Sequence, residues 1–232
     1  MELLKAEQIT KKYFTKPVLQ GLDLILEEGK IYGLLGPNAS GKTTLMKIMA
    51  GVVQPSAGQI TIQGNRVGAE TKQVVSFMPT VNHLPKWMKV KQCLSFFRDI
   101  FPDFDPEKAR ELIGEMDLKE EQKVGSLSTG MIGRLKLVLA LARKAKLYVL
   151  DEPLNGLDPV SRDKVLKVML SACQEDNTIL ISSHIINELE NTLDEIIFLD
   201  QGRVVLSGNA EEFRKSKGIS IDALYREVFG NV

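Results

Sequence analysis

The segment 36–44, Gly-Pro-Asn-Ala-Ser-Gly-Lys-Thr-Thr, is the feature that most restricts how this chain can fold. It matches the pattern Gly-x-x-x-x-Gly-Lys-Ser/Thr, in which a loop between a strand and a helix cradles phosphate groups. The flanking residues fit that context. An apolar run over 31–35 predicts a buried strand, and apolar residues share one helical face over 43–50. We therefore expect a strand, a phosphate-binding loop and a helix, with a nucleoside triphosphate as the ligand.

The residue types in this loop suit a phosphate ligand. Gly36 and Gly41 allow the backbone to curl, so that successive N–H groups point into one concavity. The positive end of the following helix adds to the attraction for anionic oxygens. We expect Lys42 to reach the β- and γ-phosphates and the Thr43 hydroxyl to bind Mg²⁺. The alternative, an ordinary glycine-rich turn, does not explain the flanking strand and helix.

Length, composition and charge narrow the class of protein. With 232 residues, 44% hydrophobic and 26% charged, the chain has the composition of a soluble globular protein with one large domain, or a core with an inserted subdomain. Because 30 basic residues balance 30 acidic ones, we expect no nucleic-acid partner. The first residues are too charged for a signal peptide. No run approaches the roughly eighteen apolar residues that would predict a membrane span.

The two cysteines, Cys93 and Cys173, lack the spacing of a metal site. Their use suits a reducing cytoplasm better than secretion. Cys93 lies within a helical apolar pattern, so we expect it in the core.

Short strands surround the phosphate-binding loop in the sequence. Residues 2–9 and 22–28 have strand patterns, and the second alternates as a half-buried antiparallel strand does. Further strands are expected over 59–64 and 74–78. Tyr13 lies between the first two strands, where it could stack on an adenine ring or pack on the sheet as an ordinary loop aromatic.

The middle of the chain has helical periodicity from Leu84 to about Val124. Asp-Pro at 105–106 predicts an N-cap and the first residue of a helix that extends to Met116. We interpret this region as an inserted helical subdomain. The apolar residues of 81–88 either dock a partner protein or fill the core of this subdomain.

The segment 127–131, Leu-Ser-Thr-Gly-Met, precedes a helix with a buried face. Ser128 or Thr129 would cap this helix, which explains the segment locally. A Ser-x-Gly turn at a helix start can also bind an anion, so two interpretations stand here.

Two carboxylates follow a second buried strand. The apolar residues of 147–150 predict that strand, and Asp151 and Glu152 stand at its carboxyl end. In an open α/β sheet ligands bind at that edge, where Asp151 can hold Mg²⁺ and Glu152 can polarise a water molecule. The alternative is a pair of solvated acids at a strand end.

The remaining segments complete the predicted sheet. Asp-Pro at 158–159 begins a helix, and capping explains it locally. A buried strand over 178–183 ends just before His184. A lone histidine is more often structural, but at this edge it could contact a γ-phosphate. A hairpin is expected over 196–206 and an amphipathic helix over 219–229.

Together these segments resemble the ATP-binding cassette (ABC) family, from about Leu3 to Gly208. The loop 36–44 resembles the family's Walker A motif, and 147–152 resembles Walker B with its catalytic glutamate. Residues 127–131 are similar to the signature Leu-Ser-Gly-Gly-Gln, which separates this family from other P-loop ATPases.

The resemblance implies a fold class: an α/β P-loop NTPase (RecA-like) core with an antiparallel β subdomain and an inserted α-helical subdomain. We expect one ABC ATPase domain over 1–232. Residues 1–80 and 129–210 would form the core with the β subdomain, 81–128 the helical subdomain, and 211–232 a C-terminal helical tail.

The resemblance also assigns roles to residues. Glu152 is expected to be catalytic together with His184, which occupies the position of the switch histidine. Thr43 and Asp151 are expected to bind the metal, with Thr80 contributing through a water molecule. The expected nucleotide contacts come from the adenine-stacking aromatic, the Walker A loop, the signature and the D-loop: Tyr13, Gly36, Pro37, Asn38, Ala39, Ser40, Gly41, Lys42, Thr43, Thr44, Ser128, Gly130 and Asp158.

Three positions depart from the family pattern. The signature has Thr129 for the first glycine of the pair and Met131 for the glutamine. Thr80 stands where the Q-loop usually has a glutamine or glutamate. Its hydroxyl falls about 2–3 Å short of a glutamine amide by side-chain geometry. A bridging water molecule could fill that gap.

The resemblance implies ATP and Mg²⁺ as cofactors, and a second ATP-binding subunit, identical or different, that closes head to tail on ATP. Hydrolysis by a water molecule activated at Glu152 would then drive a separate integral-membrane subunit. We expect an ATPase subunit at the cytoplasmic face of the cell membrane, and its short length favours export. The alternative is a soluble ABC ATPase of the cluster-assembly type.

Overall fold

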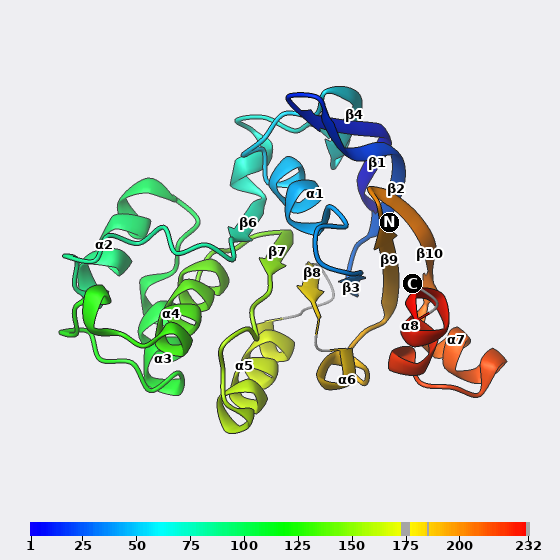
Figure 1. Cartoon of the computed structure of the whole chain (residues 1–232). Helices are drawn as coiled ribbons and strands as arrows, with labels where there is room; N and C mark the ends of the chain where they lie inside the picture. The colour runs from blue at the N-terminus through cyan, green and yellow to red at the C-terminus, as the bar shows by residue number, and fades with distance from the viewer. Residues whose placement is uncertain (173–176, 185, 231–232) are drawn as a thin grey trace.

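The structure, a computed structural model, describes residues 1–172, 177–184 and 186–230. Cys173 lies outside the described residues. Figure 1 shows a central sheet with a block of helices (α2, α3 and α4) at one end and a second sheet over one face. Within the described residues, no helix combines the length and the apolar character needed to cross a membrane.

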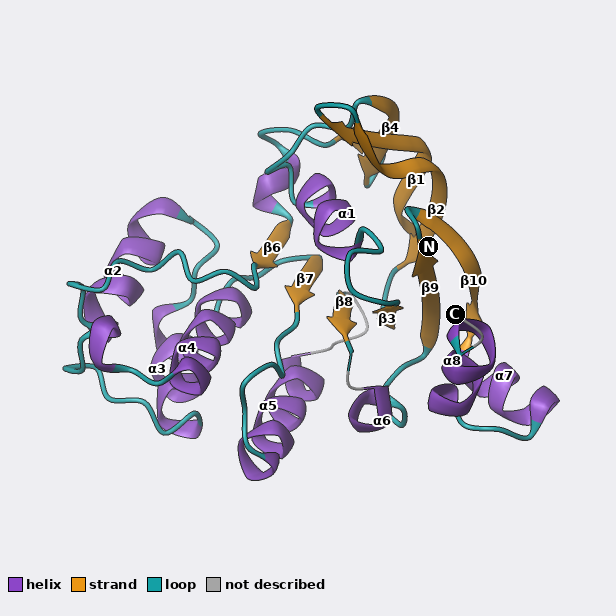
Figure 2. Ribbon diagram, in the orientation of Figure 1, coloured by secondary structure: helices purple, strands orange, loops and turns teal. Residues whose placement is uncertain are grey.

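Six strands form the larger sheet, in the order β10-β9-β3-β8-β7-β6 (Figure 2). All its pairs are parallel except β9 with β10. Every residue of β3, β7 and β8 is buried, because both faces of the sheet are covered. The carboxyl ends of the parallel strands meet at one edge, where ligands bind in such sheets. The strands are β3 (Ile31–Leu35), β6 (Val75–Met78), β7 (Leu147–Asp151), β8 (Thr178–Ser183), β9 (Glu195–Asp200) and β10 (Arg203–Asn209).

The smaller sheet is antiparallel, in the order β2-β1-β4-β5. Its first two strands are longer than expected, and Tyr13 is the last residue of β1, paired with Lys16, rather than a loop residue. The sequence hid this extension because that end of the hairpin is exposed and lacks an apolar alternation. The strands are β1 (Glu2–Tyr13), β2 (Lys16–Glu27), β4 (Ala57–Ile62) and β5 (Asn65–Arg66).

Two apolar layers hold these sheets together. One contains α1 and the smaller sheet. The other, on the opposite face, contains α4, α5 (Pro159–Ala172), α6 (Ile186–Leu189) and α8 (Ile221–Phe229). The first helices are α1 (Lys42–Met49), α2 (Val90–Ile100), α3 (Pro106–Glu115) and α4 (Thr129–Leu141), with short 3₁₀ helices η1 (Thr71–Gln73) and η2 (Val124–Ser126). The helices and strands together confirm the predicted α/β class.

The helical block differs from the prediction at its start. Residues 84–89 are not helical, and α2 begins at Val90. The backbone N–H of Lys89 donates to Gln92 Oε1 at 2.8 Å, which caps the helix there. The predicted cap of α3 is confirmed, since Asp105 Oδ1 accepts hydrogen bonds from two backbone N–H groups at 3.0 and 3.1 Å. Cys93 is buried as expected.

The C-terminal part contains more helix than expected. The predicted helix over 219–229 is observed as α8, and a second helix, α7, precedes it and ends at Gly218, whose φ of 66° is left-handed. The helices of this half are α5 (Pro159–Ala172), α6 (Ile186–Leu189), α7 (Ala210–Lys217) and α8 (Ile221–Phe229).

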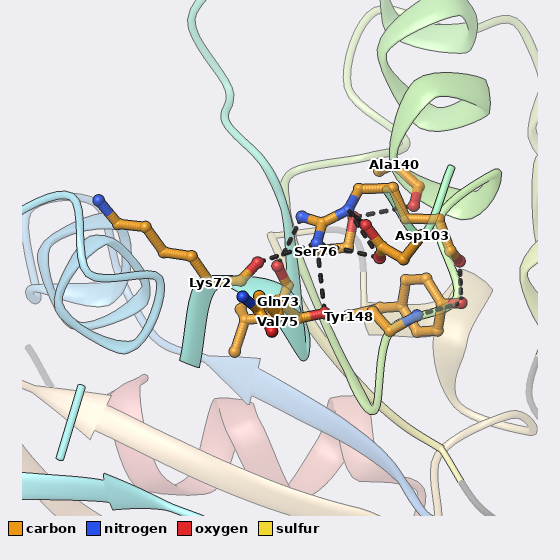
Figure 3. A network of polar contacts seen from close by, with 9 residues as sticks. Lys72, Gln73, Val75, Ser76, Asp103, Ala140 and Tyr148 are labelled. Carbon is orange, nitrogen blue, oxygen red and sulfur yellow. Dashed lines mark hydrogen bonds and ion pairs between the residues drawn. The ribbon is translucent and has the colours of Figure 1, made fainter. Parts of the chain in front are cut away.

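A buried arginine joins the helical block to the larger sheet. Arg143, just after α4, is 4% exposed, and its Nε lies 3.0–3.1 Å from the carboxylate oxygens of Asp103. Its other nitrogens donate to the carbonyls of Val75 and Lys72, both at 2.8 Å. The guanidinium also stacks on Phe101, with 4.1 Å from Cζ to the ring centroid. Figure 3 shows the hydrogen bonds with Lys72, Val75 and Asp103 converging, so one side chain connects three segments.

Candidate nucleotide site

The predicted phosphate-binding loop lies between β3 and α1, as the sequence indicated. Gly41 precedes α1 with a left-handed φ of 113°, a conformation that favours glycine. A Cβ on Gly36 would lie 2.1 Å from the carbonyl oxygen of Leu199, so only glycine fits there. Gly202 N–H donates to the carbonyl of Ser40 at 2.9 Å. The loop is therefore held against the β9–β10 hairpin.

Lys42 is buried inside this loop. Its Nζ donates to the carbonyls of Gly36 at 2.7 Å and Pro37 at 3.0 Å. Burial lowers the pKa of this ammonium group below its ordinary value, and the charges of Glu152 and Asp151 oppose that shift. An anionic phosphate at the loop would provide a stronger partner than neutral carbonyls.

Two further features of the loop fit a phosphate group. The Ser40 hydroxyl is buried, and no described residue forms a hydrogen bond with it. The first N–H groups of a helix have no partner within the helix, and those of α1 begin at this loop. The loop thus offers unsatisfied polar groups that a phosphate could bind.

Asp151 is fully buried at the end of β7, with 0% exposure. The Thr43 hydroxyl donates to its Oδ2 at 2.9 Å, and the Ser182 hydroxyl donates to its Oδ1 at 2.7 Å. Hydroxyl and carboxylate oxygens are ligands that Mg²⁺ prefers. The described residues contain no cluster of three or more His, Cys, Asp or Glu that could hold a metal.

Glu152 follows directly but turns away from Asp151. Its φ of 53° is left-handed, which is strained for a residue other than glycine. Its backbone N–H donates to the Ser182 hydroxyl at 3.0 Å, and its Oε2 lies 2.7 Å from His184 Nδ1. Its side chain is 14% exposed, whereas that of His184 is 51% exposed. The turn therefore separates the two acids. Asp151 is buried beside Thr43, whereas Glu152 lies in the cleft with His184.

A cleft of about 910 Å³ collects most of the predicted residues, including the phosphate-binding loop, Tyr13, Glu152 and His184. Tyr13 is 42% exposed, and Lys11 Nζ lies 5.2 Å from its ring centroid. Thr80 also lines the cleft, but its hydroxyl donates to the backbone carbonyl of Asp151 at 3.3 Å. In this arrangement the Thr80 hydroxyl contacts the strand end that carries Asp151 rather than the carboxylate itself.

Five predicted nucleotide contacts do not line this cleft: Gly36 and Pro37 at the start of the loop, and Ser128, Gly130 and Asp158 elsewhere in the chain. The Ser128 hydroxyl caps α4 by accepting from Met131 N–H at 3.2 Å, and Asp158 accepts from Ser161 N–H at 3.0 Å. The predicted capping roles are therefore both present. The residues at the N-terminus of α1 line this cleft, whereas Ser128 and Gly130 at the N-terminus of α4 do not, so the two helix ends do not share it within one chain.

Two residues of the site were missed from the sequence. Ser182 contacts both acids, and the hydroxyl residues that end an otherwise apolar strand over 178–183 were a usable signal. Lys136 is 6% exposed, and its Nζ donates to the carbonyls of Pro79 and Thr80, each at 2.7 Å. A lysine on the buried face of a helix was visible in the sequence, but its partners are backbone groups that no pattern marks.

Comparison with known proteins identifies the family. A sequence profile described as ABC transporter matches residues 19–155. The ABC transporter ATP-binding protein YtrB of Bacillus subtilis (strain 168) is 33% identical over 216 residues, which are 92% of this chain and 74% of that protein. The Nod factor export ATP-binding protein I of Burkholderia orbicola (strain AU 1054) is 33% identical, covering 96% of this chain and 75% of that protein.

A solved structure gives the same result at the level of the fold. The structure described as the ATP binding subunit of an ABC transporter superposes with a TM-score of 0.87 at 28% identity, covering 97% of this chain and 98% of that one. The profile spans more than half of the chain, and the relatives cover nearly all of it. This chain therefore belongs to the ABC transporter family, as one of its ATP-binding proteins.

Proposed function

We propose that this chain binds and hydrolyses ATP as the nucleotide-binding subunit of an ABC transporter. The observation that carries the proposal is a single cleft lined by the phosphate-binding loop, Glu152 and His184, with Asp151 buried behind Thr43, whose hydroxyl donates to it. Lys42 and the N-terminal N–H groups of α1 would bind the β- and γ-phosphates, and the exposed ring of Tyr13 would stack on the adenine.

The geometry of the two acids supports a division of labour between them. Thr43 and Asp151 would hold Mg²⁺, whose charge would offset that of the phosphates. Glu152 would accept the proton of the attacking water as its oxygen bonds to the γ-phosphorus and the bond to the ADP oxygen breaks. His184, 2.7 Å from Glu152 Oε2, would orient that carboxylate.

We also propose that two subunits close head to tail on ATP. Ser128 and Asp158 are exposed on the free subunit, and neither belongs to the cleft of its own chain. In a head-to-tail pair they and Gly130 would meet the ATP that is bound to the phosphate-binding loop of the second copy. Both the Ser128 turn and the N-terminus of α4 are suited to an anionic ligand.

The proposed docking site for the membrane subunit is a groove beside α2, of about 440 Å³. Pro79 lines it at the end of β6, while Phe96 and Ile100 line it from α2, 49% and 50% exposed. Trp87 precedes α2 in the chain and is 67% exposed, so it does not fill the core of the helical block, whereas Met88 packs against that core. An apolar helix from the cytoplasmic side of a membrane protein would suit this groove.

The finer assignments rest on resemblance. A relative named for Nod factor export supports export as the direction of transport. If the chain binds a separate membrane subunit, it would lie at the cytoplasmic face of the cell membrane. We propose that residues 1–232 act as one ABC ATPase domain, with 81–128 as the helical subdomain and 211–232 as the tail.

The experiment that tests the proposal measures ATP binding and hydrolysis by the purified chain with Mg²⁺. Glu152→Gln should keep ATP affinity within about twofold and lower the hydrolysis rate by at least about 100-fold, because the water loses its base. Lys42→Ala should instead weaken ATP binding, because it removes the charged donor from the loop. Hydrolysis by Glu152→Gln at the rate of the unmodified chain would contradict the proposal.

A further inference from the structure

The loop after β6 is held in place through its backbone carbonyls rather than through the Thr80 side chain. β6 and β7 are parallel neighbours, with Met78 opposite Leu150. Residues 79–80 therefore lie beside Asp151 at the carboxyl edge of the sheet. The only hydrogen bond from the Thr80 hydroxyl among the described residues goes to the backbone carbonyl of Asp151, at 3.3 Å. That single contact would position the loop only weakly relative to Asp151.

Lys136 supplies the stronger contact. Its Nζ donates to the carbonyls of Pro79 and Thr80, each at 2.7 Å, and the residue is only 6% exposed. A buried ammonium group is costly unless its donors are satisfied. In the described part of the chain no carboxylate forms an ion pair with it, so two backbone carbonyls are its partners. Hydrogen bonds from a charged donor are about twice as strong as neutral ones.

The position of Lys136 in α4 makes this contact informative. Ser128 caps the same helix, and Lys136 lies about 12 Å along it at the rise of an α-helix. A displacement of the Ser128 end of α4 would therefore move the ammonium group with it. The two carbonyls would carry that displacement to the backbone next to Asp151.

We propose that Lys136 is a positioning residue, whose ammonium group fixes the backbone of Pro79 and Thr80 against the Asp151 strand end and links it to the Ser128 helix. The inference rests on the proposed function, since it concerns the same hydrolysis at the same cleft. Lys136 does not touch the nucleotide in this account. It determines how well the Thr80 loop and Asp151 are placed when the second subunit closes on α4.

The test compares three variants of the full chain. Lys136→Met keeps the length of the side chain but removes its donors, and Lys136→Arg keeps charge and donors. Arg134→Met is the matched control, since Arg134 lies on the same helix and donates to a backbone carbonyl, that of Met116, at 2.8 Å. This control also removes a hydrogen bond from a cation to a carbonyl, but the carbonyl belongs to the helical block instead of the Thr80 loop.

The measurements are ATP affinity, the single-turnover rate of Mg²⁺-ATP hydrolysis, and hydrogen–deuterium exchange of the amides of 80–83. Lys136→Met should lower the rate about tenfold, because small misplacement of supporting groups slows the chemical step, and leave ATP affinity within about twofold. Exchange in 80–83 should accelerate in this variant alone. Lys136→Arg should recover most of the rate, and Arg134→Met should stay within about twofold of the unmodified chain.

Two results would overturn the inference. One is a folded Lys136→Met protein with the unmodified rate and unmodified exchange in 80–83. The other is an equal loss of rate in Lys136→Met and Arg134→Met, which would indicate a general effect on helix stability. Exchange is measured without ATP, so it still tests the position of the loop if the chain proves unable to hydrolyse ATP. In that case the proposed function fails while the positioning role is judged separately.

Discussion

At the scale of single residues, the candidate site depends on two adjacent acids in different surroundings. The sequence predicted Asp151 and Glu152 at a strand end, and the structure places them there. What the pattern could not predict is their separation, because it depends on the φ of 53° at Glu152 and on the Ser182 hydroxyl, which contacts both residues. Ser182 comes from another strand, so no local pattern of β7 contains it.

The Thr80 hydroxyl should contribute little to the chemical step. Its one contact among the described residues is a 3.3 Å hydrogen bond to the Asp151 carbonyl, and the bonds from Lys136 to the backbone of the loop would survive its removal. Thr80→Ala should therefore lower single-turnover hydrolysis by less than about tenfold, or about 1.4 kcal/mol. The comparison is with Glu152→Gln in the same assay. An equally deep defect in both variants would mean that Thr80 touches the reacting centre.

At the scale of elements, the apolar patterns predicted the parallel strands and the helices around the site. They failed at the ends of elements. The β1–β2 hairpin extends to Tyr13 through exposed residues, and its backbone pairing carries no apolar signal. α2 begins later than the helical periodicity predicts. Leu84 is buried although it lies in an irregular segment, and the helix is capped at Lys89. Where tertiary contacts bury apolar residues outside a helix, periodicity overestimates the length of the helix.

The contact between the helical block and the sheet should depend on Arg143. Removing it leaves Asp103 and two carbonyls without their donor in a mostly buried location. Arg143→Met should lower the free energy of unfolding by about 3 kcal/mol, the usual cost of breaking a buried pair. Urea unfolding measures this change.

The matched control is Arg98→Met, which removes an exposed pair with Asp99 and should cost less than about 0.5 kcal/mol. If the two variants were equally stable, Arg143 would not join the helical block to the sheet in any energetically important way.

At the scale of the whole molecule, the proposed assembly predicts that Trp87 serves the partner rather than the fold. Its side chain is 67% exposed, so Trp87→Ala should leave the unfolding midpoint and ATP affinity unchanged. It should reduce the coupling of ATP hydrolysis to the membrane subunit in the assembled transporter. Val205→Ala is the control, since Val205 is 49% exposed on β10, which lies at the opposite edge of the larger sheet from β6. Equal coupling in both variants would exclude Trp87 from the docking surface.

The predicted nucleotide contacts of Ser128, Gly130 and Asp158 require a second subunit. Ser128, Gly130 and Asp158 were predicted to contact nucleotide, yet they lie outside the cleft of their own chain. Their local roles are caps and close packing: a Cβ on Gly130 would lie 3.0 Å from the Gly156 carbonyl. A second copy would have to bring them to ATP, so their nucleotide role depends on an assembly that neither the sequence patterns nor the fold of one subunit contains.

The most direct test of the account is the mass of the Glu152→Gln protein in solution, measured by light scattering during gel filtration. With ATP and Mg²⁺ the account predicts a dimer, because both phosphate-binding loops hold ATP and no hydrolysis reopens the pair. With ADP we expect a monomer, because ADP lacks the γ-phosphate. A Glu152→Gln protein that binds ATP, shown by nucleotide eluting with it, and yet remains a monomer would contradict the account.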